Sequence, residues 1–241
     1  MTNWVTQGVI VGAKNHGEKN ALVFIFTADH GLRAGIFRNA QASKNRSILQ
    51  MGNRVDAAWK ARLQEHLGEW KLEVLQQVFS FILDDRLKLI MLEEICNLIH
   101  KILPEGHPYP NLYVQFVTFL ERLKTPQFLE AYVKFEIEFL KEMGFGLDFT
   151  KCAVTNVQQG LTHVSPNTGR AVCASVAEPY EKKLLKLPPF LHENAPCTMQ
   201  DLKDGLVLTG YFLEKHFKTD KLTMVFEQRD QLTVLLNDRK Y

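Results

Sequence analysis

The hydrophobic residues of this chain change their spacing near residue 80, and that change constrains the fold more than any other feature. Before it, runs rich in Val, Ile, Phe and Trp alternate with turn residues such as Gly17 and Gly31. Runs of this length and composition are typical of β-strands. The five runs cover residues 5–13, 21–28, 32–37, 54–63 and 70–79. Five strands in so short a segment predict a small barrel of the OB type.

From residue 84 onward, apolar residues recur with helical spacing until Pro104 interrupts the pattern. Further helices are predicted over 111–123, 127–143 and 198–217, and Thr198 with Asp201 resembles a capping box. The tail from residue 222 is amphipathic but ambiguous, and 147–178 lose the helical period. We therefore predict an α+β chain. An N-terminal OB-fold barrel over residues 1–80 precedes an all-helical domain over 81–241, which carries an insertion at about 147–178.

Positive charge is concentrated in the predicted barrel. The whole chain has a net charge of only +2, yet residues 1–80 hold ten Lys and Arg against six Asp and Glu, and residues 30–55 contain no carboxylate. A loop of one charge sign on a β-rich module is typical of a polyanion-binding surface, although solvated surface cations are the plainer alternative. The predicted DNA-binding residues are Arg33, Arg38, Lys44, Arg46, Arg54, Lys60 and Arg62.

Aromatic residues accompany these cations in both parts of the chain. In the barrel, aromatic rings could stack on bases, but an aromatic residue on a strand usually belongs to the core, and we expect that for most of them. The residues concerned are Phe24, Phe26, Phe37, Trp59 and Trp70. In the helical part, Arg122, Lys134 and Phe135 suggest an apolar groove with a cationic rim. Core aromatics beneath surface bases explain the same pattern.

Two cysteines, Cys152 and Cys173, each begin a four-residue frame whose fourth position holds no second cysteine. A structural zinc site needs four ligands, and here half of them are missing. His163 and Cys197 are further candidate ligands, but we expect a knuckle held by packing and no cofactor. Residues 164–172 read as a hairpin that resembles the remnant of a zinc ribbon.

The sequence contains no phosphate-binding glycine loop, nucleophile elbow or HExxH motif, so we do not expect an enzyme. The start of the chain lacks the pattern of a signal peptide, and no apolar run reaches the roughly 18 residues of a membrane span. Few cysteines also fit a reducing compartment. These features predict a cytoplasmic protein.

Several short motifs, taken in order, resemble the RecO family of bacterial recombination mediators, which act in DNA repair. They are GVIV at 8–11, HGE at 16–18, HG at 30–31, GFGLDF at 144–149, CAVT at 152–155, Tyr180 with Leu184 and Leu185, and PPFL at 188–191. The basic loop and the stretch at 164–171 also occupy the positions along the chain at which the resemblance places them. The resemblance covers nearly the whole chain.

The resemblance implies an OB-fold that binds single- and double-stranded DNA and anneals complementary strands in the RecF pathway. It also implies that the protein, with RecR, assists RecA loading onto DNA coated by single-strand-binding protein (SSB). The acidic tail of SSB would dock on the helical domain, where Lys134 matches a basic position of the family and Arg122 and Phe135 are further candidates. Some relatives carry a four-cysteine zinc site where this chain keeps only Cys152 and Cys173. Such proteins are associated with the bacterial nucleoid and need no membrane partner.

Two other functions remain open from the residues alone. An RNA-binding OB protein would use the same cationic surface. A non-enzymatic scaffold would bind a partner peptide through the helical groove and leave the basic loop as a solvated surface.

Overall fold

The computed structural model describes residues 2–63, 66–193, 195–219 and 223–238. The chain forms two compact units, Met1–Lys124 and Thr125–Tyr241. No helix among the described residues is long and apolar enough to cross a membrane.

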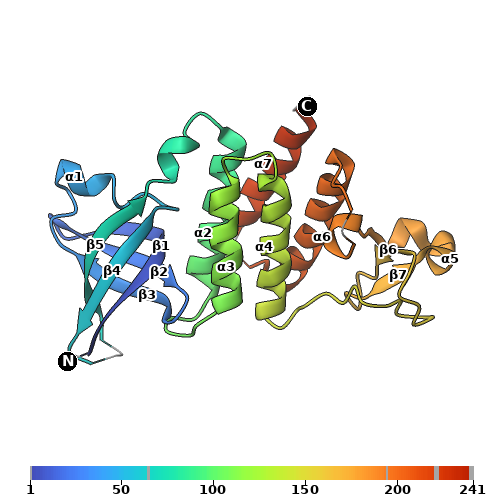
Figure 1. Cartoon of the computed structure of the whole chain (residues 1–241), viewed down its shortest axis with the longest axis horizontal. Coiled ribbons are helices and arrows are strands. Elements are labelled where there is room, and N and C mark those ends of the chain that lie inside the picture. The colour runs from blue at the N-terminus through green and yellow to red at the C-terminus, as the bar shows by residue number, and fades with distance from the viewer. Residues whose placement is uncertain (1, 64–65, 194, 220–222, 239–241) are drawn as a thin grey trace. The chain divides into compact units, whose positions relative to one another are not determined.

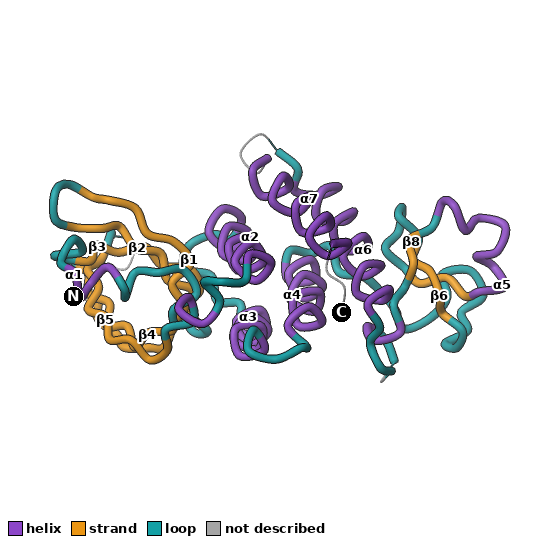
Figure 2. Tube along the Cα trace, turned by 90° about the horizontal axis from the view of Figure 1, so that it is seen from above, coloured by secondary structure: helices purple, strands orange, loops and turns teal. Residues whose placement is uncertain are grey.

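The first unit is built on a closed barrel of strands β1 (Thr2–His16), β2 (Asn20–Thr27), β3 (Gly31–Phe37), β4 (Arg54–Ala61) and β5 (Gly68–Gln76). Neighbouring strands follow the order β1-β2-β3-β5-β4, and β4 pairs back with β1. Only the β3–β5 pair in this ring is parallel. Figure 1 labels the strands, and Figure 2 shows them as a ring. The prediction of a five-stranded, OB-like barrel is confirmed.

Two tryptophans lie in the interior of the barrel. Alternate residues of a strand point to the same face, and both tryptophans occupy inward-pointing positions. Trp59 and Trp70 lie opposite each other on β4 and β5 and are 1% and 3% exposed. Their indole N–H groups donate to the carbonyl oxygens of Ala34 and Val23, each at 3.2 Å, so burial leaves neither unsatisfied. The other three aromatic residues considered as stacking platforms, Phe24, Phe26 and Phe37, are also buried. The expectation of core positions is confirmed for all five.

Two helices, α2 (Arg86–Ile102) and α3 (Pro110–Arg122), belong to the same unit and follow a short turn of 3-10 helix, η1 (Phe79–Phe81). The rings of His100 and Phe24 lie 4.0 Å apart, which brings α2 against β2. Asp85 caps α2 by accepting a hydrogen bond from the backbone N–H of Lys88 at 3.3 Å. This unit therefore extends beyond residue 80, and the domain boundary placed there stays a prediction.

The second unit packs α4 (Phe128–Glu142), α6 (Met199–Phe217) and α7 (Thr223–Asp238) together. The capping box predicted at the start of α6 is present, with Asp201 N–H donating to the Thr198 hydroxyl and Thr198 N–H donating to the Asp201 carboxylate. Gly144 ends α4 with a φ of +84°, a conformation that glycine adopts without strain. The ambiguous tail is helical from Thr223, whereas residue 222 lies outside the described residues.

A small sheet completes this unit. Strands β6 (Leu161–Val164), β7 (Ala171–Cys173) and β8 (Leu185–Lys186) follow the order β7-β6-β8, and the predicted hairpin is the β6–β7 pair. The sequence did not predict β8 or the short helices α5 (Ala174–Ala177), η2 (Glu178–Lys183) and η3 (Pro189–Leu191). The ammonium of Lys215 on α6 donates to the carbonyl of Pro166 at 2.6 Å and so holds the hairpin turn against the helix.

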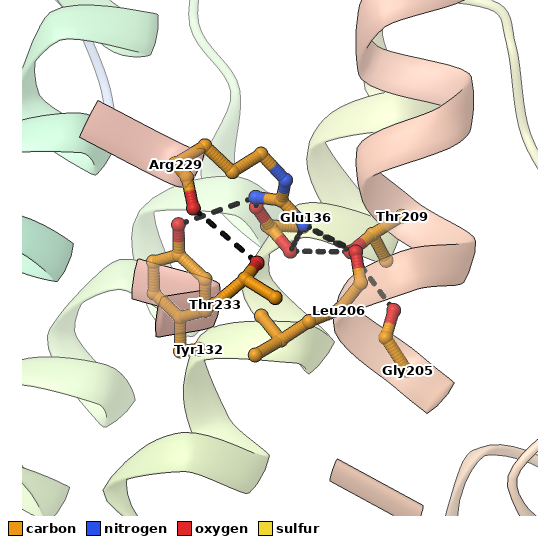
Figure 3. Close-up of polar contacts among 7 residues, drawn as sticks. All are labelled: Tyr132, Glu136, Gly205, Leu206, Thr209, Arg229 and Thr233. Carbon is orange, nitrogen blue, oxygen red and sulfur yellow. Dashed lines mark hydrogen bonds and ion pairs between the residues drawn. The ribbon is translucent and has the colours of Figure 1, made fainter. Parts of the chain in front are cut away.

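A buried ion pair joins α7 to α4 and α6 (Figure 3). Both terminal nitrogens of Arg229 bond to the carboxylate of Glu136, whose residue is 0% exposed. The guanidinium also donates to the Leu206 carbonyl at 2.7 Å and to the Thr209 hydroxyl at 2.9 Å. The Thr209 hydroxyl donates in turn to Glu136 at 2.5 Å. Each charge in this apolar interior is therefore matched and hydrogen-bonded.

Candidate nucleic-acid interface

The basic loop between β3 and β4 is held in a fixed shape. It contains one short helix, α1 (Ser43–Arg46), on which Lys44 and Arg46 are exposed. Asn53 at the end of the loop is 1% exposed, and its amide donates to the carbonyls of Ser47 and Ile48 at 2.8 and 3.1 Å. Its side-chain oxygen accepts the backbone N–H of Val78 at 3.0 Å. Side-chain bonds of this kind reduce the entropy that a flexible loop would lose on binding.

Three of the predicted cations converge on one hollow of the barrel surface. Arg38, Lys60 and Arg62 line it together with His16 and one carboxylate, Glu69, and its volume is about 580 Å³. Arg38 lies just after β3, Lys60 lies on β4, and Arg62 follows β4. Barrel closure thus gathers three cations that are up to 24 residues apart in the chain.

Glu69 lies between these cations. Register places it directly opposite Lys60 on β4, and its carboxylate forms two bonds to the guanidinium of Arg38, at 2.5 and 2.9 Å. The hydrogen bond from Arg38 lowers the pKa of Glu69, so the carboxylate is ionised at neutral pH. Side chains of both residues remain largely in solvent, with exposed fractions of 69% and 48%. The pair is accessible to a competing anion.

A second hollow, of about 520 Å³, shares Lys60 and Glu69 with the first and extends the cationic surface to Lys71. All three tryptophans and the exposed Val5 also line it. Lys71 is absent from the predicted set. The pairing of β4 with β5 is what identifies Lys71, which lies opposite Ala58. Lys71 is two residues from Glu69 on β5, so both side chains point to the same outward face of the barrel.

The structure places Arg33 and Arg54 differently. The Arg33 guanidinium carbon lies 5.6 Å from the centre of the Trp59 ring and close to Gly106. Arg54 forms an ion pair with Glu121 of α3 at 3.4 Å, and its side chain is only 22% exposed. Neither lines the two hollows, so of the seven predicted residues only Arg38, Lys60 and Arg62 come together, with Lys44 and Arg46 nearby in the chain.

Comparison with known proteins agrees with this architecture. The family model "Recombination protein O N terminal" matches residues 1–78, and "Recombination protein O C terminal" matches 83–223. The protein "DNA repair protein RecO" of Rhodospirillum centenum is 41% identical over 215 residues, which cover 88% of this chain and 86% of that protein. The chain belongs to the RecO family. It is thus a member of a family of DNA repair and recombination proteins.

Relatives from other bacteria show the same extent of similarity. The RecO protein of Cereibacter sphaeroides (strain ATCC 17029) is 39% identical over 88% of this chain and 89% of its own length. That of Methylocella silvestris is 36% identical over 90% of this chain and 89% of its own length. Both matches span the barrel and the helical part of this RecO chain.

In the second unit of this RecO chain, Lys134 lies on the surface of α4 with a side-chain exposure of 44%. It pairs with Glu130 one turn earlier at 2.6 Å, and its ammonium lies 6.0 Å from the centre of the Phe190 ring. Phe135 is 0% exposed, which corrects its proposed role in peptide docking, because a fully buried ring cannot contact a docked peptide. Arg122 is exposed but belongs to the first unit.

Two of the four cysteines of this RecO chain, Cys152 and Cys173, meet at the small sheet. The backbone N–H of Cys173 donates to the Cys152 sulfur at 3.4 Å, and the Thr155 hydroxyl lies 3.5 Å from the Cys173 sulfur. Burial alone would raise the pKa of the Cys152 thiol, but hydrogen bonds from the Thr155 side chain and from nearby N–H groups lower it to about 6. His163 contacts Thr162 instead, at 2.9 Å. Among the described residues, no three His, Cys, Asp or Glu side chains lie close enough to hold a metal ion.

Proposed function

We propose that this RecO-family chain binds single- and double-stranded DNA through the surface formed by the two hollows, and anneals complementary strands on it. The observation that carries the proposal is the convergence of Arg38, Lys60 and Arg62 on one hollow, continued by Lys71. Arginine and lysine contact phosphate oxygens without reading bases. Two backbones held on such a surface repel each other less, which favours pairing. The activity needs no nucleotide hydrolysis and no catalytic residue.

We further propose that the protein works as a recombination mediator. With RecR it would assist RecA loading onto single-stranded DNA covered by SSB, in the bacterial cytoplasm at the nucleoid. The acidic, Phe-ended tail of SSB would dock near Lys134. Support comes from the exposed ammonium of Lys134, a cation that can pair with the carboxylate of an acidic peptide. Glu130 would have to release Lys134 when the peptide carboxylate arrives.

Fluorescence anisotropy of a labelled single-stranded oligonucleotide, titrated with the protein at several salt concentrations, tests the DNA-binding proposal. We expect tight binding at low salt that weakens steeply as salt rises, because binding releases counterions from the strand. Little dependence on base sequence is expected, and an annealing assay with complementary strands follows. Absence of binding at low salt would contradict the proposal.

Two experiments distinguish DNA binding from the two alternatives, an RNA-binding protein and a peptide-docking scaffold. An RNA strand of matched sequence that displaces the DNA with clear preference would favour an RNA-binding protein. An acidic peptide ending in Phe that binds while every oligonucleotide fails would favour a docking scaffold. Lys134→Gln should weaken peptide binding and leave DNA affinity unchanged, which keeps the two surfaces separate.

Neutralising Glu69 is expected to strengthen DNA binding. In the original protein, phosphate must displace Glu69 to reach Arg38, and Glu69→Gln removes this competition together with the carboxylate that faces Lys60. We expect affinity to rise about 5-fold at about 0.1 M salt, the size of one phosphate contact on a single strand, while the log–log salt slope stays the same because the number of phosphate contacts does not change. Anisotropy at several salt concentrations measures both.

Glu73→Gln is the matched control for that variant. Glu73 is exposed on the same strand and makes the same charge change, but it lines neither hollow. We expect a smaller gain than for Glu69→Gln. An equal gain from the two variants would mean that only net charge matters and that Glu69 has no special position.

A further inference from the structure

The small sheet of the second unit brings two cysteine sulfurs into one hydrogen-bonded cluster. The Cys152 sulfur accepts the backbone N–H of Cys173 at 3.4 Å. The Cys173 sulfur lies 3.5 Å from the hydroxyl oxygens of both Thr155 and Ser175. The backbone N–H of Ala153 also donates to the carbonyl of Ala171 at 2.8 Å, so the two chain segments run side by side at the cysteines.

This arrangement is poorly suited to a metal ion, because two hydroxyl groups lie beside the Cys173 sulfur where further thiolates would be needed. It suits a different reaction of paired thiols. A disulfide requires two cysteines whose backbones lie close together, and the Cys152 sulfur lies 3.4 Å from the backbone nitrogen of Cys173. The function proposed above uses neither cysteine.

We propose that Cys152 and Cys173 form a reversible intrachain disulfide when the protein meets a hydroperoxide. The thiolate of Cys152 attacks one peroxide oxygen, the O–O bond breaks, and the leaving oxygen takes a proton to give an alcohol, or water from hydrogen peroxide. Cys152 is then a sulfenic acid. The Cys173 sulfur attacks the Cys152 sulfur, the S–O bond breaks, and the hydroxyl leaves as water with the thiol proton of Cys173. The thiols lose two electrons and the peroxide gains them.

Roles within the pair follow from the contacts. The Cys152 sulfur receives a backbone N–H, which favours its anionic, nucleophilic form. Cys173, beside two hydroxyl groups, resolves the sulfenic acid. Both cysteines are buried, at 0% and 5% exposure, while the segment 154–160, which follows Cys152 in the chain, is exposed throughout. A thiol reductant restores the starting state.

The remaining cysteines provide internal controls. Cys96 is buried in α2, and burial raises its pKa. Burial together with the carboxylates of Glu130 and Asp201 raises the pKa of Cys197 to about 11. Within the described part of the chain, Cys96 is hydrogen-bonded to the backbone of Gly52, and Cys197 donates to the carbonyl of Thr198 at 3.7 Å. We therefore expect both to stay reduced under conditions that oxidise the pair.

The test treats the intact protein with hydrogen peroxide at neutral pH, blocks remaining thiols with an alkylating reagent, and maps tryptic peptides without reduction. Cleavage after Lys151, Arg170 and Lys182 puts the two cysteines on separate peptides, 152–170 and 171–182. A cross-link between these peptides, removed by a reductant, is the expected result, with Cys96 and Cys197 alkylated. If both peptides were fully alkylated after peroxide treatment, the proposal would be overturned. This test uses the original protein, so its result does not depend on the folding of a variant.

A second measurement assigns the roles. In Cys173→Ser the sulfenic acid cannot be resolved, so dimedone should label Cys152 at least tenfold more than Cys197. In Cys152→Ser we expect no labelling of Cys173 above the level of Cys197. Equal labelling of all cysteines would overturn the proposal. Stoichiometric zinc in the purified protein, measured by plasma mass spectrometry, would also overturn it, because the sulfurs would then be metal ligands.

Discussion

Replacing Arg38, Lys60 and Arg62 together by glutamine is expected to weaken single-stranded DNA binding about 100-fold at about 0.1 M salt. The three side chains line one hollow, and each phosphate contact on a single strand contributes about 0.7 to the log–log salt slope. Losing three contacts lowers that slope by about 2, so the variant and the original protein should converge as salt approaches about 1 M. Anisotropy over a salt series measures affinity and slope together.

A matched control removes three lysines from the second unit, namely Lys141, Lys186 and Lys218. Each of these lysines is exposed and paired with a glutamate. Replacing all three by glutamine removes three positive charges, as the first triple variant does. We expect unchanged affinity, and a circular dichroism spectrum like that of the original protein for both triple variants. Original affinity in the Arg38, Lys60 and Arg62 variant would remove the hollow from the DNA-binding surface.

The sequence predicted the barrel because the signals that build it are local. Alternation along each run sets which side chains point inward, and glycines mark the turns, so the positions of Trp59 and Trp70 in the core follow from residues close in the chain. The capping box at Thr198 was predictable for the same reason. The hairpin of β6 and β7 was predictable from the residues of its own turn.

The composition of the candidate site depended on contacts across the barrel, which periodicity does not contain. Arg38 and Glu69 are 31 residues apart in the chain and meet because β3 pairs with β5. The predicted set therefore included Arg38 without its partner and missed Lys71, while it included Arg54, which pairs with Glu121 on α3. Cations that are close together in the sequence therefore lie on different sides of the barrel once the strands pair.

Phe135 shows how adjacency misleads on a helix. Successive residues of an α-helix point about 100° apart, since 3.6 residues make one turn. Lys134 reaches solvent while Phe135, its neighbour in the chain, is fully buried. Residues three or four apart share a face, as Lys134 does with Glu130. A docking surface read from consecutive residues therefore mixes the outside of α4 with its core.

The tail was ambiguous for a related reason. The inward positions of α7 include Phe226, Arg229, Leu232 and Leu236, all buried. An arginine at one of these positions interrupts the apolar stripe by which an amphipathic helix is recognised. Its partner Glu136 is 93 residues earlier, so the sequence gives no local sign that the charge is matched.

We expect Arg229→Met to destabilise the second unit by about 3–5 kcal/mol. The substitution leaves the carboxylate of Glu136 fully buried without its cation, although the Thr209 hydroxyl still donates to it. Urea unfolding followed by far-ultraviolet circular dichroism measures the loss. All three tryptophans of the chain lie in the barrel, so their fluorescence serves as a separate probe of the first unit in the same samples.

The double variant Glu136→Leu with Arg229→Met distinguishes an unmatched charge from lost packing. Removing both charges leaves no unmatched ion at this position, so most of the lost stability should return, because apolar replacements of buried ion pairs are often neutral or stabilising. Arg170→Met, which breaks an exposed pair with Asp148, should cost less than about 1 kcal/mol. If the double variant were as unstable as Arg229→Met, the guanidinium would act through its contacts with Leu206 and Tyr132, and charge matching would not be what ties α7 to α4.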